Sequence, residues 1–233
     1  MFVPLHDKNP IEHINFQFVT IALIIINISV FILFQSSLVI PNSEASWASF
    51  ALVPNEFLPE GLIGPSMPGE QYDFFPIAEK WTLITYMFLH GGIMHLLGNM
   101  LFLWVFGDNI EDAMGHVRFL IFYLLCGVAA GLTHSFMAPN SDIPLIGASG
   151  AIAGVIGAYL MLHPKVQVWV LVLGRIPLPV NAALAIFAWF AFQVFHIIYM
   201  EGGNTAWWAH IGGFIAGIIL VLFMRRRGVP LFN

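Results

Sequence analysis

Apolar residues fall into long runs along this chain of 233 residues, separated by short stretches rich in polar residues, glycine and proline. An apolar run of about 20 residues is long enough to cross the hydrocarbon core of a bilayer as a helix. The pattern predicts an all-α polytopic membrane protein, and without an internal repeat we expect one membrane domain over residues 1–233. Six transmembrane helices are expected, at residues 16–34, 93–106, 117–137, 149–163, 178–200 and 205–224.

Breaks in the apolar pattern set the expected helix ends. The polar turn Gly107-Asp108-Asn109 ends the second helix. Pro164 ends the fourth, because proline lacks the N–H that a helix needs. Outside the helices we expect a short polar tail at residues 1–15, a long acidic and aromatic loop at 41–80, and a membrane-surface segment at 166–172.

Composition supports this class. The chain is 59% hydrophobic and 9% charged, with a mean hydropathy of +0.84, whereas soluble domains carry about 25% charged residues. The net charge of −5 gives no basis for binding nucleic acid, because the acidic residues gather in the loop at 41–80. The single cysteine, Cys126, excludes an intramolecular disulfide.

Lysine and arginine are distributed unevenly between the two sides of the predicted bundle. The side without the termini carries only Lys80. The positive-inside rule therefore places both termini in the cytoplasm and the loop at 41–80 outside. The seven basic residues on the terminal side are Lys8, Arg118, Lys165, Arg175, Arg225, Arg226 and Arg227.

Ser149 begins a segment in which glycine and alanine recur at helical spacing, from Gly150 to Gly157. Such a face lets neighbouring backbones approach closely. The helix from Ser149 to His163 spans roughly 22 Å, whereas the hydrocarbon core is about 30 Å thick. If the helix ends at the cytoplasmic surface, Ser149 lies below the outer surface. A polar residue there needs a partner or water. The same pattern also fits a simple packing face whose serine bonds its own backbone.

His210 is the first candidate partner for Ser149. It lies one turn inside the pair Trp207-Trp208, which is typical of the membrane interface, so its depth matches that of Ser149. Gly213 and Gly217 share its helix face and allow an imidazole to approach a hydroxyl. A nucleophile beside a base is the minimum for acyl transfer. Taken alone, His210 fits a buried polar contact equally well.

His95 and Asn99, four residues apart, lie on one face near the start of the second helix. Both can donate hydrogen bonds, as a tetrahedral oxyanion requires, and the N–H of Ser149 at a helix start would be a third donor. Their alternative role is a polar clamp between helices. His90 fits a structural residue that ties the preceding loop to this helix.

Metal binding and a triad have little support. The segment His90 to His95 is not an HExxH motif, and the helices hold no set of cysteines or carboxylates with ligand spacing. No Asp or Glu is well placed to orient His210, which leaves a Ser-His dyad. Four other histidines are expected to be loop or interface residues: His116, His134, His163 and His196.

Three motifs together make the chain resemble the rhomboid family of intramembrane serine proteases, over residues 81–227. They are HGGIMHLLGN from His90, GASGAIAG from Gly147 and HIGGFIAG from His210. The resemblance implies a six-helix rhomboid-like bundle in the basic bacterial form, located in a bacterial inner membrane. It implies Ser149 as nucleophile, His210 as general base, oxyanion donors His95 and Asn99, structural His90 and Glu111, and site glycines Gly147, Gly213 and Gly217.

The chain departs from the family pattern at two places. It has Trp81-Thr82 where many members have Trp-Arg, which leaves the packing of that loop open. It has Ala153 where some members place a tyrosine beneath the catalytic histidine. Another residue must therefore hold the ring of His210.

The resemblance implies a protease that hydrolyses a peptide bond in or beside the transmembrane segment of another membrane protein, without cofactor or metal. Its partners would be such segments and the lipid bilayer, entering beside the loop at 41–80 or the helix at 178–200. The oligomeric state is not predicted. One alternative is an inert rhomboid-like protein that binds membrane clients, although such relatives typically lack the serine or the histidine. A transporter with His95, Asn99 and His210 as a proton relay is another, but it lacks an inverted repeat.

Overall fold

A computed structural model describes residues 3–36, 38, 49–60, 77–172, 175–199 and 206–233. Much of the predicted loop at 41–80 lies outside these residues, so its location stays a prediction. The same holds for residues 200 and 205, the expected ends of two helices. The described part of the loop includes a short helix, α3 (Pro54–Glu60).

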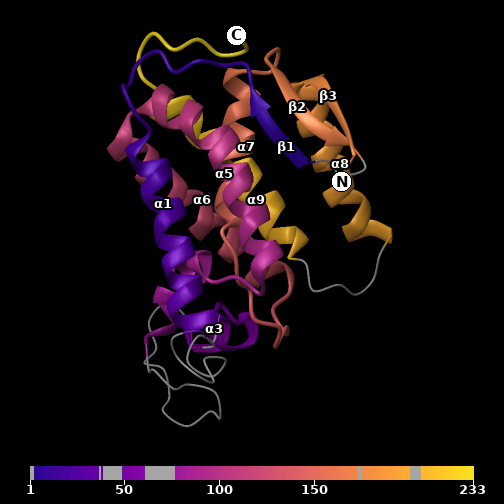
Figure 1. The fold of residues 1–233 in the computed structure, drawn as a ribbon. Coiled ribbons are helices and arrows are strands. Elements are labelled where there is room, and N and C mark those ends of the chain that lie inside the picture. The colour runs from indigo at the N-terminus through magenta and orange to yellow at the C-terminus, as the bar shows by residue number, and fades with distance from the viewer. Residues whose placement is uncertain (1–2, 37, 39–48, 61–76, 173–174, 200–205) are drawn as a thin grey trace.

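Membrane-length helices dominate the described part of the chain (Figure 1). Five are long and apolar enough to cross a membrane, and α7 is apolar but shorter. This confirms a polytopic helical bundle. The helices are α1 (Phe18–Val30, continued by a π-helical turn at Phe31–Gln35), α5 (Ile93–Met114), α6 (His116–Met137), α7 (Ser149–Leu162), α8 (Ala182–Tyr199) and α9 (Trp207–Met224). Short helical turns at Glu79–Trp81, α4 (Thr82–Thr85) and Tyr86–Phe88 precede α5.

The predicted end of the second helix at residue 106 is wrong, because α5 continues to Met114. Its polar residues are satisfied by neighbours and so do not end the helix. The buried carboxylate of Glu111 accepts the N–H groups of Val19 and Thr20 at 2.9 and 2.8 Å. These are N–H groups at the start of α1 that have no partner within their own helix. Glu111 therefore caps α1.

A three-stranded antiparallel sheet, ordered β1-β2-β3, was not predicted. It comprises β1 (Val3–Asp7), β2 (Gln167–Val172) and β3 (Ile176–Asn181). The polar tail at 1–15 thus contains a strand, and the expected helix start at 178 is wrong because Leu178 pairs with Val170 of β2. Pro177 and Pro179 disfavour a helix there. The pairing of β1 with β2, two segments far apart in the sequence, leaves no local pattern that would predict it.

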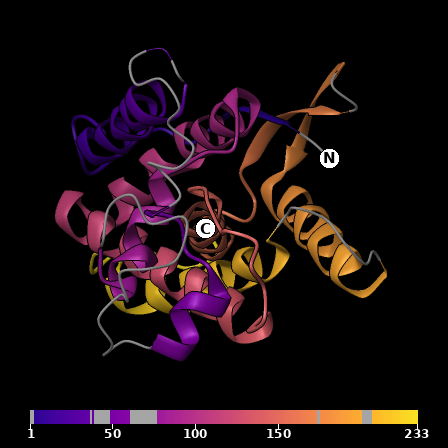
Figure 2. The same cartoon turned by 90° about the horizontal axis from the view of Figure 1, so that it is seen from below.

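α7 is the centre of the bundle: all its residues except Ser149 and Met161 are buried. It meets α9 backbone to backbone. A Cβ on Gly213 would lie 1.9 Å from the carbonyl oxygen of Gly150, so no other residue fits there without separating the helices. Seen from below, α1 and α8 lie on opposite sides of the bundle (Figure 2).

The far end of α7 is tied to both ends of the chain. The hydroxyl of Tyr159 donates to Oδ2 of Asp7 in β1 at 2.5 Å. The N–H groups of Phe232 and Asn233 donate to the carbonyls of Met161 and Leu162 at 2.8 and 3.0 Å. The described ends of the chain therefore lie at the same end of the bundle, where α7 ends (Figure 1).

Candidate active site

Gly147 brings the chain against α5 just before α7 begins. Its N–H donates to the carbonyl of Tyr86 at 2.9 Å, and its φ of 121° favours glycine. A Cβ here would lie 2.8 Å from the ring of His95 and 3.6 Å from Nδ2 of Asn99. The loop therefore passes directly over these two side chains and delivers Ser149, the first residue of α7, beside them.

Ser149 and His210 are in direct contact. Nε2 of His210 lies 2.8 Å from Oγ of Ser149. His210 is in the first turn of α9, and the close glycine contact between α7 and α9 sets the separation of the two backbones. Each side chain is only partly buried. The structure thus brings together two residues whose proximity the sequence predicted.

A cavity of about 1220 Å³ opens onto this pair. Among the described residues, no Asp, Glu, Lys or Arg lines it, so the chemistry of the site rests on neutral polar groups. No three His, Cys, Asp or Glu side chains in the described part of the chain are placed to hold a metal ion. The polar side chains that line the cavity are His95, Asn99, His134, Ser141, Ser149, Gln193 and His210, with the indole of Trp189 and Trp207.

His95 and Asn99 supply hydrogen-bond donors to the cavity. The N–H of Gly91 donates to Nδ1 of His95 at 3.4 Å. A neutral imidazole with an acceptor at Nδ1 carries its hydrogen on Nε2. Asn99 is buried, and its Nδ2 has no hydrogen-bond partner among the described residues. Asn99 also lines the cavity, so this donor is available to an acceptor in the cavity, such as water or a bound group.

His90 lies behind these donors and does not line the cavity. Its buried ring meets that of His95 edge-on, with centroids 5.1 Å apart. Its backbone N–H and carbonyl both bond the side-chain amide of Gln35, at 2.9 and 3.0 Å. The backbone of His90 is therefore tied to the end of the first membrane span, and its ring supports His95.

Two residues of the site were missed from the sequence. His134 was expected in a loop or interface, but it lies in α6 and lines the cavity. Gln193 in α8 places its Oε1 3.0 Å from Nδ1 of His210. The available signal was weak: Gln193 and His196 are the only strongly polar side chains in an otherwise apolar and aromatic helix.

Much of the chain is similar to known proteins. A family model described as the Rhomboid domain matches residues 78–227. The chain is 35% identical over 139 residues to "Rhomboid protease GluP" of Bacillus subtilis (strain 168), which covers 60% of this chain and 25% of that protein.

Plant proteins are also similar. The chain is 32% identical over 154 residues to "RHOMBOID-like protein 6, mitochondrial" of Arabidopsis thaliana, covering 64% of this chain and 46% of that protein. It is 29% identical over 174 residues to "RHOMBOID-like protein 5" of the same plant, covering 71% and 53%. The matched part thus spans about half the length of these two curated relatives.

Proposed function

This chain belongs to the rhomboid family, and we propose that it is an intramembrane serine endopeptidase that cleaves transmembrane segments of other membrane proteins. The observation that carries the proposal is the 2.8 Å contact between Ser149 Oγ and His210 Nε2 at a polar cavity. In this proposal Ser149 is the nucleophile and His210 the general base, and the reaction needs no metal or cofactor.

The reaction proceeds through an acyl-enzyme. Ser149 Oγ attacks the scissile carbonyl carbon as its proton passes to Nε2 of His210, which then gives that proton to the leaving amine. The oxyanion accepts hydrogen bonds from Nδ2 of Asn99, Nε2 of His95 and the N–H of Ser149. Water from the cavity then attacks the ester, with His210 again as the base. The unpartnered Nδ2 of Asn99 supports this assignment, because the oxyanion is the acceptor that it lacks.

The depth of the site supports a membrane substrate. The 14 residues of α7 span roughly 21 Å at 1.5 Å per residue, against about 30 Å for the hydrocarbon core. Ser149 at one end of this short helix is therefore recessed when the other end lies at a membrane surface. The lysine and arginine count supports cytoplasmic termini and a site that faces the outer side. Location in a bacterial inner membrane stays a prediction.

The alternative of an inert client-binding protein has less support. Binding alone places no demand on a hydroxyl–imidazole contact, yet both residues are present and in contact. We therefore favour the protease, with membrane-protein segments and lipid as its partners.

Labelling with a fluorophosphonate serine probe in detergent tests the proposal. Ser141→Ala is the matched control, because Ser141 also lines the cavity but makes no hydrogen bond to a histidine in the described part of the chain. We expect wild type and Ser141→Ala to be labelled and to cleave a model transmembrane substrate. Ser149→Ala and His210→Ala should lose both, with cleavage reduced at least ~10³-fold. Labelling that survives Ser149→Ala would show that another residue is the nucleophile.

A further inference from the structure

We infer that Gln193 is the positioning residue for His210: its side-chain carbonyl accepts the Nδ1–H hydrogen and so holds the ring with a bare Nε2 toward Ser149. The inference rests on the proposed function and extends it to a third helix. It also addresses a question that the sequence raises: which residue holds the ring of His210 in a chain that has Ala153 where the resemblance to the family would allow a tyrosine.

The hydrogen bonds at the two ring nitrogens fix the tautomer. With the amide of Gln193 turned so that Oε1 faces the ring at 3.0 Å, the contact requires the hydrogen on Nδ1 of His210, because an amide oxygen can only accept. A neutral imidazole has one N–H, so its Nε2 then carries a lone pair. That lone pair faces the Ser149 hydroxyl at 2.8 Å and can accept its proton. The opposite tautomer would point an N–H at the serine and could not act as a base.

The position of Gln193 on α8 argues against a role in packing alone. The buried residues of α8 form one stripe, made of Ala182, Ala185, Ile186, Trp189 and Gln193. Gln193 is the only member with a strongly polar side chain. Burying an amide costs free energy unless it is hydrogen-bonded, so an apolar residue would serve packing better. The contact with His210 explains why this buried position holds a glutamine.

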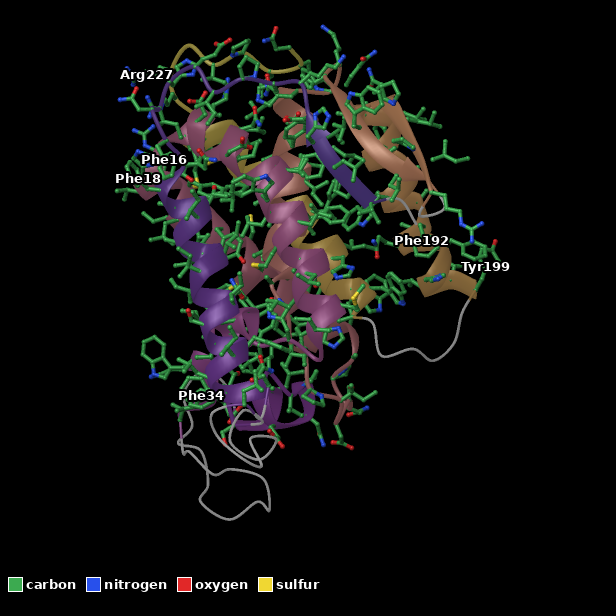
Figure 3. The ribbon with its side chains drawn as sticks, viewed as in Figure 1. Phe16, Phe18, Phe34, Phe192, Tyr199 and Arg227 are labelled. Carbon is green, nitrogen blue, oxygen red and sulfur yellow. The ribbon has the colours of Figure 1, made fainter. Side chains whose placement is uncertain are left out.

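α8 contacts His210 at Nδ1, whereas α7 contacts it at Nε2. Trp189, one turn before Gln193, has its ring centroid 6.0 Å from that of His210. Farther along α8, the ring of His196 meets Trp207 at 4.6 Å. Figure 3 shows Phe192 and Tyr199 on α8 at the side of the molecule away from α1. Alignment of the dyad therefore depends on α8 lying against α9.

Two substitutions at Gln193 separate positioning from packing. Gln193→Met keeps the length of the side chain but removes the acceptor, and Gln193→Glu keeps an acceptor and adds a charge. Ile198→Met, at a site 62% exposed on the same helix, is the matched control. For each protein we would measure the labelling rate, kcat and KM on a model transmembrane substrate between pH 5 and 9, and thermal stability in detergent.

We expect Gln193→Met to lower kcat and the labelling rate roughly 10- to 100-fold with KM little changed, because the wrong tautomer then competes. Gln193→Glu should stay within a few-fold of wild type at high pH. The midpoint of the acidic limb of its pH–rate profile should move up by about one unit, since a carboxylate at Nδ1 stabilises the protonated ring. Ile198→Met should match wild type throughout.

The outcomes distinguish this inference from the proposed function. Failure of wild type to label at Ser149 would overturn the proposed function itself. Labelled wild type together with a Gln193→Met protein of normal rate and unchanged pH profile would overturn the role of Gln193 alone. If Gln193→Met does not fold, the inference is tested with Gln193→Glu. An unshifted acidic limb, or a rate loss equal to that of the methionine variant, would reduce Gln193 to a packing residue.

Discussion

Two interfaces of α9 meet at His210, and they are built from opposite kinds of residue. Toward α7, glycines bring the backbones together: a Cβ on Gly217 would lie 2.0 Å from the carbonyl oxygen of Gly154. Toward α8, aromatic side chains fill the contact, with the ring of Trp207 5.9 Å from that of Phe192. Each interface brings a polar group to one ring nitrogen of the same histidine.

The difference shows which part of the site is rigid and which part can adjust. Helices in lipid gain little from hydrophobic burial and associate through close packing of small residues. A glycine interface has no side chains that can change rotamer, so the backbones alone set the distance between Ser149 and His210. The aromatic side chains at the interface with α8 can repack by changing their χ angles. The reacting pair therefore lies on the fixed interface and the orienting amide of Gln193 on the adjustable one.

The largest effect is expected from breaking the glycine interface. Gly213→Ala forces a Cβ to within 1.9 Å of the carbonyl oxygen of Gly150, so the helices must separate. Overpacking of this kind costs about 3 kcal/mol of unfolding free energy, and we expect cleavage to fall below roughly 1% of wild type because the dyad distance grows. Denaturation followed by circular dichroism, with a cleavage assay, measures both.

Gly98→Ala is the control for this substitution. Gly98 is also in a membrane helix, but a Cβ there meets no atom within 4 Å. Its unfolding free energy should change by no more than about 1 kcal/mol. Equal stability losses in the two variants would mean that the close approach of α7 and α9 does not hold the bundle together.

Much of this fixed interface could be predicted from the sequence. Small residues at Gly150 and Gly154 and at Gly213 and Gly217 recur at helical spacing, and the tryptophans before His210 indicate its depth. Both are local patterns. The proximity of Ser149 and His210 follows from them, while their catalytic roles remain proposed.

The adjustable interface could not be predicted in the same way. Whether Gln193 faces lipid or His210 depends on the rotation of α8, which is set by packing and not by spacing along the chain. The sheet that leads into α8 pairs β2 with β1, more than 150 residues apart. The extension of α5 to Met114 depends on Glu111 finding the N–H groups of α1. Each of these features arises from contacts between distant segments.

A smaller effect is expected from loosening the aromatic interface. Phe192→Ala removes the ring that packs on Trp207, at a cost of about 1 kcal/mol, and should lower kcat a few-fold by weakening the hold of Gln193 on His210. Phe187→Ala, at an α8 position 60% exposed, is the control and should change neither quantity.

A double variant sharpens this test of coupling. If Phe192 acts through Gln193, adding Phe192→Ala to Gln193→Met should lower kcat no further, because the hydrogen bond is already lost. Kinetics on the model substrate would measure the coupling. Fully multiplicative losses would show that the aromatic contact affects catalysis by another route.

The smallest effect concerns the far end of α7, where Tyr159 donates to Asp7. Burial raises the pKa of Asp7 above its usual value, so the folded protein favours the neutral carboxyl. The resulting stabilisation is complete below the usual pKa of 3.8 and is lost as the pH rises through the raised value. Asp7→Asn keeps a neutral acceptor for Tyr159 at every pH. Thermal unfolding should therefore find the variant equal to wild type in acid and more stable at pH 8, by less than about 2 kcal/mol.

Asp142→Asn, at an exposed carboxylate near the other end of the bundle, is the control for the loss of a carboxylate and should not raise the stability at pH 8. Cleavage by Asp7→Asn should be unchanged, because Tyr159, the partner of Asp7, lies roughly three helical turns from Ser149 along α7. A stability difference that does not vary with pH would show that the pKa of Asp7 is the same in the folded and the unfolded protein. Loss of cleavage would instead show that the β1 end of α7 sets the position of Ser149, so that the fixed interface with α9 does not do so alone.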